Sequence, residues 1–343
     1  MKNYFVFELK RSLFGIGCIA IAAVVLYVIP VLSASGSRYP TGLLAGISAI
    51  GGTIALGVPV WLLSYKMRRR SVDLYYALPL PRVKILSVRL LVGLIAVFAP
   101  YTLAYLLGAI VSAVRFSGQL RGVIFLANYL ASLIPILIIY AVSAFVFTRA
   151  NTFFDGIVFL AFWGLIMLLF GALLNEFYII GSYVNGEAFS PYGALNTSTR
   201  YFMDVIQIPS GTQLPPGVDY PVGADFALDA EEIVGLVLCP LMGIGSGIGL
   251  FLLEPRSKAE QVGQISDSLF GYKSMLPAYT VLLMAMFDLS YSMMFVTVAV
   301  VIVLMFALTA IYRHTVKIGW KQAVVYGASI LVGLMLGLIV HRF

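Results

Sequence analysis

Uncharged apolar runs of about 20 residues recur along this chain and leave it few possible folds. A run of that length lets a helix cross the hydrocarbon core of a bilayer. The composition agrees, because 61% of the 343 residues are hydrophobic and only 11% are charged, whereas soluble domains carry about 25% charged residues. The sequence therefore predicts an all-α polytopic membrane protein.

The apolar runs predict about nine transmembrane helices, with eight as the fallback. The expected spans are 13–33, 42–65, 85–112, 122–147, 153–174, 233–253, 270–287, 291–312 and 322–340. The stretch 276–312 is divided at Asp288, because one helix there would be about 55 Å long, nearly twice the hydrocarbon thickness. No cleavage site follows the first run, so we expect a retained span and no signal peptide.

The distribution of charge predicts the orientation. With the N-terminus in the cytoplasm, 17 of the 22 basic residues fall on the inner side, as the positive-inside rule requires. The outer side keeps Arg38, Arg115, Arg121, Arg200 and Arg342. The net charge of +7 is therefore explained by topology, and it gives no reason to expect a nucleic-acid partner.

Residues 1–343 are expected to form a single transmembrane domain with four notable segments. These are an interfacial amphipathic segment at 1–14, a cytoplasmic segment at 66–84, an extracytoplasmic acidic and aromatic loop at 175–232, and a second cytoplasmic loop at 254–275. The outer loop holds eight of the 15 acidic residues, and its aromatic part is expected to form short helices that dip toward the membrane. Residues 276–343 then supply the extra C-terminal spans.

Residues that carry enzymatic chemistry are scarce. The chain has no Gly-x-x-x-x-Gly-Lys-Ser/Thr loop for nucleotide phosphates. Its two histidines, His314 and His341, lie at span ends and cannot assemble a zinc site. Cys18 and Cys239 lie in apolar runs, which favours buried small hydrophobes over a disulfide. We therefore expect neither catalysis nor a cofactor in this chain.

Two acidic residues keep a second class of function open. Asp155 opens the fifth span, where a helix N-terminus favours a carboxylate. Asp288 lies between two late spans, where a turn residue is favoured over an ion site. An ion-coupled secondary transporter or channel using these carboxylates is the alternative to a transporter driven by another protein.

The segment 66–84 contains a short predicted helix. Ser71 is the expected N-cap, with Asp73 in the first turn, and Val72 to Leu78 make about two turns before Pro79 stops them. Leu74 and Leu78 share one face, flanked by Tyr75 and Tyr76. Such an apolar-aromatic helix fits either a soluble partner or an anionic membrane surface.

Two inner segments resemble one protein family. The stretch Arg69–Leu86 (RRSVDLYYALPLPRVKIL) resembles the cytoplasmic segment between the second and third spans of bacterial ABC-2-type ABC transporter permeases. The loop Arg256–Gly263 (RSKAEQVG) is similar to a loop of the same permeases. The family's common core has six spans, so the expected nine are a departure from it.

The resemblance implies an ABC-2-type permease bundle in a bacterial cell membrane. The helix in 66–84 would be a coupling helix that contacts a separate ATPase, through Arg69, Arg70, Asp73, Leu74, Tyr75, Tyr76, Leu78 and Arg82. Two ATPase subunits would bind ATP and Mg, and a second permease, identical or homologous, would complete the exporter. A peptide, lipid-like or other amphipathic compound would be the cargo. A membrane peptide sensor or immunity protein, binding at the outer loop, is a further alternative.

Overall fold

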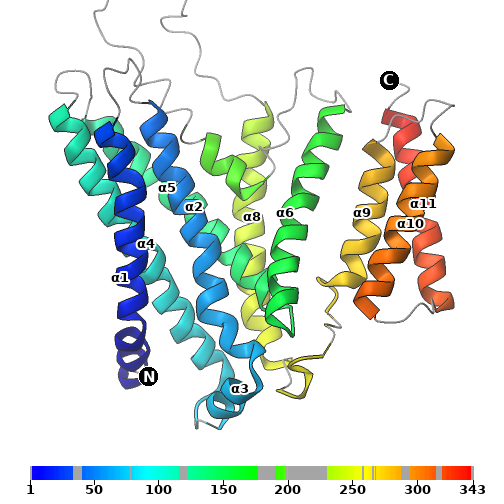
Figure 1. Cartoon of the computed structure of the whole chain (residues 1–343), viewed down its shortest axis with the longest axis horizontal. Helices are drawn as coiled ribbons and strands as arrows, with labels where there is room; N and C mark the ends of the chain where they lie inside the picture. Colours follow the sequence, from blue (N-terminus) through cyan, green and yellow to red (C-terminus); the bar gives the residue numbers. More distant parts are fainter. Residues whose placement is uncertain are drawn as a thin grey trace, which may run out of the picture. The chain divides into compact units, whose positions relative to one another are not determined.

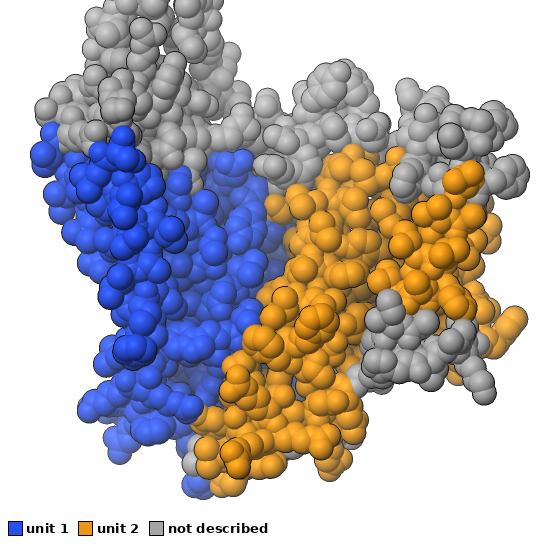
Figure 2. Space-filling model, viewed as in Figure 1, with its two compact units in different colours: residues 1–63, 78–144, 191–255 blue, residues 64–77, 145–190, 256–343 orange. Residues whose placement is uncertain are grey.

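The computed structural model describes residues 2–33, 41–77, 79–115, 122–176, 190–197, 199, 230–256, 259–264, 266, 268–286, 294–313 and 319–340. These residues form helices and short turns, without a strand (Figure 1). The chain divides into two compact units (Figure 2). The first comprises Met1–Leu63, Leu78–Ala144 and Pro191–Pro255, and the second comprises Ser64–Ala77, Phe145–Ser190 and Arg256–Phe343.

The first unit is built from five long helices: α1 (Lys2–Ser33), α2 (Thr41–Leu63), α4 (Arg82–Arg115), α5 (Gly122–Phe147, up to Ala144) and α8 (Ala230–Leu253). Helix α4 packs along both α1 and α2 (Figure 1). The side of α1 that is buried forms one stripe at helical spacing, made of Glu8, Ser12, Ile16, Ala23, Tyr27 and Val31. The predicted segment 1–14 and the first span are thus one continuous helix.

Tyrosines and glycines bring α4 close to its neighbours. A Cβ atom at Gly108 would overlap the ring of Tyr27 from α1, and one at Gly93 would overlap Tyr140 from α5. The Tyr140 hydroxyl donates to the Leu90 carbonyl at 3.0 Å. Small residues allow such close helix packing in a membrane, where interhelical hydrogen bonds add stability.

The second unit contains η1 (Ser64–Met67), α3 (Arg69–Tyr76), the end of α5, α6 (Phe153–Glu176), η4 (Ala259–Gln261), α9 (Tyr272–Met286), α10 (Met294–Arg313) and α11 (Trp320–Val340). Helix α9 contacts α6, α10 and α11, which makes it the centre of this unit. Leu276, Met305 and Tyr326 form a buried cluster from α9, α10 and α11. The 3₁₀ turn η3 (Glu254–Arg256) lies where the chain passes from the first unit to the second.

All nine predicted spans coincide with helices. Within the described part of the chain, seven helices are long and apolar enough to cross a membrane, namely α1, α2, α4, α5, α6, α8 and α11, so the expected polytopic helical membrane protein is confirmed at that level. The division at Asp288 agrees with the helix bounds, because α9 ends at Met286 and α10 begins at Met294, although Asp288 itself lies outside the described residues. With only 15 residues, α9 is about 22 Å long and shorter than the hydrocarbon core. The count of nine spans therefore stays a prediction.

Large apolar side chains on the helix surfaces also fit a bilayer. Phe14 is 85% exposed, Ile21 67% and Val303 66%. Soluble monomers do not expose contiguous apolar surface of this extent, whereas lipid covers it. Cys18 lies on this exposed surface of α1, which corrects the expectation of burial, while Cys239 is buried as predicted.

Most of the outer loop 175–232 lies outside the described residues. Residues 191–197 are helical and pack into the first unit, where Ala194 contacts Ile138 of α5 and Cys239 of α8. The Thr199 hydroxyl hydrogen-bonds to the Ser48 hydroxyl at 2.7 Å. Ser48 lies two turns inside α2 and Ile138 lies deeper within α5. This short helix therefore enters the helical bundle, in agreement with the predicted short helices of this loop.

Candidate docking surface

Helix α3 begins earlier than the sequence predicts. Arg68 is the N-cap in an extended conformation, and its carbonyl accepts the amides of Ser71 at 2.9 Å and Val72 at 3.0 Å. Ser71 is therefore inside the helix, and its prediction as the N-cap is wrong, because the backbone carbonyl of Arg68 starts the hydrogen-bonding pattern three residues upstream. The C-cap is Ala77, whose amide donates to the Asp73 carbonyl at 3.1 Å.

One face of α3 is buried against its own unit. Val72 is 1% exposed and Tyr75 is 5% exposed. The Tyr75 ring packs edge-to-face on Tyr65 of η1, with centroids 5.1 Å apart. The sequence predicts Tyr75 as a partner contact. In the structure this side chain is buried within its own unit, and its contact with a partner stays a prediction.

The opposite face of α3 carries Arg70, Asp73, Leu74 and Ala77, all exposed. We call these four residues the docking face. Leu74 is 65% exposed. Leu78 and the Tyr76 side chain lie outside the described residues. Arg82 is half-buried at the start of α4, in the first unit.

The loop 254–275, which is predicted to be cytoplasmic and which we call the second inner loop, supports α3 from the side. Nε of Arg69 donates to the Val262 carbonyl at 3.2 Å. The next residue, Gly263, has φ +82°, in the left-handed region that favours glycine, and its amide donates to the Asn151 carbonyl at 3.0 Å. The two inner segments that resemble one family therefore contact each other in the structure. Sequence alone gave no signal of this contact, which joins residues 193 positions apart.

The same loop is fastened to the turn between α5 and α6. The Ser266 hydroxyl donates to the Arg149 carbonyl at 2.6 Å. The Arg149 guanidinium lies over the Phe145 ring at 5.2 Å, and that ring packs on Phe270 at 4.9 Å. Helix α3, the second inner loop and the α5–α6 turn thus form one supported surface within the second unit.

Asp155, the acidic residue of the alternative hypothesis, has structural partners. The Thr152 hydroxyl caps α6 by accepting the Asp155 amide at 3.1 Å, and the Asp155 carboxylate accepts the Tyr272 hydroxyl at 2.9 Å. These contacts favour the interpretation of Asp155 as a helix N-terminal residue. Among the described residues, no three His, Cys, Asp or Glu side chains gather as a metal site would require.

Comparisons with protein families, with curated proteins and with solved structures found no match for this chain.

Proposed function

We propose that this chain is the membrane-spanning permease subunit of an ATP-driven ABC exporter of the ABC-2 type. Two separate ATPase subunits bind ATP and Mg, and a second permease, identical or homologous, completes the complex in a bacterial cell membrane. The acidic, aromatic outer loop favours a peptide, lipid-like or other amphipathic cargo.

The exposure of the Leu74 side chain is the observation on which this proposal rests. The docking face places this exposed leucine beside Arg70 and Asp73, on a helix whose other face is buried, and apolar and charged groups together support a protein-binding site. The contacts of α3 with Val262 and Tyr65 favour transmission of force from a bound partner. A helix held in place by its neighbours passes a displacement on to them, whereas a loosely held helix would simply bend away.

The mechanism follows from the chain connectivity. Helix α3 lies between α2 and α4 in the sequence, so a displacement imposed on the docking face reaches both long helices through η1 and through residues 77–81. Arg70 and Asp73 orient the partner, since exposed charges mainly steer association and fix register. ATP-driven closure of two partners would thereby move the helices that line the cargo path.

Co-purification with an ABC ATPase co-expressed from an adjacent gene tests this function. Leu74→Asp should weaken ATPase binding about 30-fold, which corresponds to about 2 kcal/mol for loss of a central apolar contact. Leu269→Asp is the matched control, because Leu269 is similarly exposed at 72% in the second inner loop but lies outside the docking face. Tyr75→Asp would be a poor test, since it would bury a carboxylate and unfold α3.

The outcomes separate the hypotheses. Equal ATPase binding by wild type and Leu74→Asp would reject the docking face. Absence of any ATPase in the wild-type complex, together with uptake or efflux driven by an ion gradient alone, would favour the secondary transporter.

A further inference from the structure

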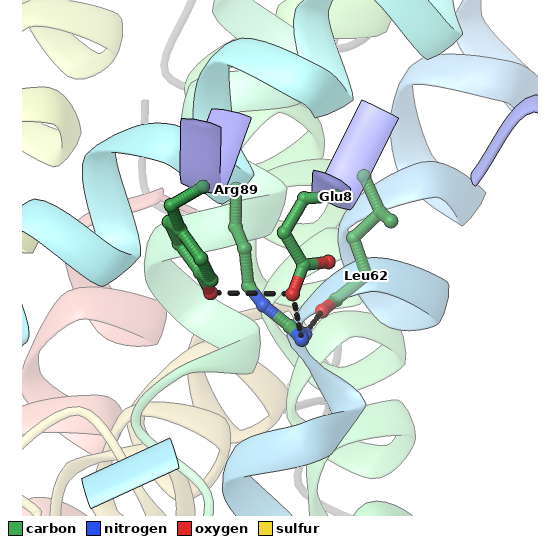
Figure 3. Close-up of polar contacts among 4 residues, drawn as sticks. Glu8, Leu62 and Arg89 are labelled. Atoms are coloured by element: carbon green, nitrogen blue, oxygen red, sulfur yellow. Dashed lines mark hydrogen bonds and ion pairs between the residues drawn. The ribbon is translucent and has the colours of Figure 1, made fainter. Parts of the chain in front are cut away.

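Two charged side chains are buried against each other in the first unit. Glu8 of α1 is 3% exposed and Arg89 of α4 is 6% exposed. Nη2 of Arg89 lies 3.2 Å from Oε1 of Glu8, and Nη1 donates to the Leu62 carbonyl at 2.7 Å (Figure 3). The Tyr4 hydroxyl also donates to Oε1 of Glu8 at 3.2 Å. One guanidinium therefore joins three helices.

This contact lies on the two helices that precede and follow α3 in the sequence. Leu62 is in the last turn of α2, and Arg89 lies two turns after the start of α4. These are the helices that flank residues 64–81 in the sequence, a stretch that includes α3 and that we call the docking segment. Arg89 thus joins the end of α2 to the first turns of α4, and Glu8 attaches α1 to the same guanidinium.

The N-terminal turns of α1 are suited to the membrane surface. Phe7 is 59% exposed and Phe14 is 85% exposed, while Glu8 and Ser12 are buried. The exposed side of these turns carries Phe7 and Phe14 together with Lys10 and Arg11, a mixture of apolar and basic residues typical of a helix at a membrane surface.

Stability alone does not explain a buried ion pair. Desolvation of two charges offsets most of their attraction, and an apolar pair of similar volume often packs as well or better. An ion pair with a defined carbonyl partner fixes register between helices in a way that apolar packing does not.

We propose that Glu8 and Arg89 are positioning residues that make the N-terminal turns of α1 move together with the base of α4. When a partner displaces the docking segment, the movement reaches α1 through this ion pair and not only through α2 and α4. This inference rests on the proposed function for the origin of the movement, but the link between α1 and α4 stands independently of it.

Spin labels at Phe7→Cys and Leu91→Cys test the link, because both positions are exposed and both lie in the first unit. A Cys18→Ser background removes the exposed native thiol. In the full-length permease reconstituted in nanodiscs, double electron–electron resonance should give one narrow distance distribution. Glu8→Gln should broaden it about twofold or more, since a helix end without tertiary contacts opens locally. Glu8→Asp, which keeps the charge, should restore part of the narrow distribution.

The double variant Glu8→Gln with Arg89→Gln distinguishes loss of helix positioning from a general loss of folding stability. It leaves no buried unpaired charge, so it should melt at a higher temperature than Glu8→Gln alone while keeping the broad distribution. A narrow distribution in folded Glu8→Gln protein, whatever its melting temperature, would overturn the inference. A narrow distribution in the double variant would do the same.

The complex with the ATPase tests whether the ion pair transmits movement from the docking segment to α1. After vanadate trapping, the distance between positions 7 and 91 should stay unchanged in the wild type and should change in Glu8→Gln. An unchanged distance in both would overturn a role in transmission. If no ATPase binds the wild type, the proposed function fails. The distance measurements on the permease alone still show whether Glu8 and Arg89 hold α1 to α4.

Discussion

Arg69 and Arg70 are adjacent arginines with different surroundings. Nε of Arg69 donates to the Val262 carbonyl, whereas Arg70 belongs to the exposed docking face. From the sequence alone, both arginines are predicted to orient a partner through their charge. The structure assigns Arg69 a second role, because its hydrogen bond joins α3 to the second inner loop. The two positions therefore form a natural pair for comparison.

Arg69→Met should loosen α3, and Arg70→Met should not. Loss of one charge-assisted hydrogen bond at a partly exposed site is worth about 1 kcal/mol, which corresponds to about fivefold faster amide exchange. Hydrogen–deuterium exchange of the α3 amides, measured on the permease without its partner, checks this. Equal exchange in the two variants would mean that the Val262 contact does not hold the helix.

Helix α11 packs closely against α9 at Gly333. A Cβ atom at Gly333 would lie 2.6 Å from Cβ of Met284 and 2.9 Å from the Val281 carbonyl oxygen. Neither atom can move without shifting the α9 backbone. Gly327, on the same helix, has nothing within 4 Å of the equivalent position.

Gly333→Ala should therefore destabilise the protein by about 1–3 kcal/mol, the usual effect of overpacking. Gly327→Ala should leave stability unchanged or slightly raised, because alanine favours a helix more than glycine does. Thermal unfolding in detergent, followed by size-exclusion chromatography with fluorescence detection, compares the two. A loss of stability in both variants would point to general intolerance in α11 and not to the close contact with α9.

Helix positions could be predicted from the sequence, whereas contacts between helices could not. An uncharged run of spanning length is a property of one segment, so all nine predicted spans coincide with helices. The start of α3 differs from the prediction because the Arg68 carbonyl, which no side-chain pattern marks, accepts the amides of Ser71 and Val72. The burial of Tyr75 depends on Tyr65, and the Glu8–Arg89 pair joins residues 81 positions apart. No periodicity within a single segment encodes such pairings.

Orientation in the membrane is the property of the whole molecule on which the predicted cytoplasmic location of the docking face depends. The inner side is predicted from 17 of 22 basic residues, and this count holds only if α9 and α10 both cross the membrane. Helix α10 has 20 residues and is about 30 Å long, but it is not among the seven helices of the described chain that meet both the length and the hydropathy of a span, and only its part Val298–Thr309 stands out as a shorter apolar helix. Helix α9, at about 22 Å, crosses only if the bilayer thins or if adjoining residues extend it.

Reporter fusions decide between nine spans and eight. With nine spans, a reporter after Phe343 lies outside, so alkaline phosphatase should be active there and green fluorescent protein should be dark. Fusions after Glu254 and after Lys321 should show the opposite, because both positions belong to predicted inner loops. A fluorescent C-terminal fusion, with the Glu254 fusion also fluorescent, would mean that the last three helices make only two crossings. If the Lys321 fusion is also not fluorescent, the basic residues between α10 and α11 lie outside, against the positive-inside rule. The predicted side of the docking face does not change, because it follows from the first two spans.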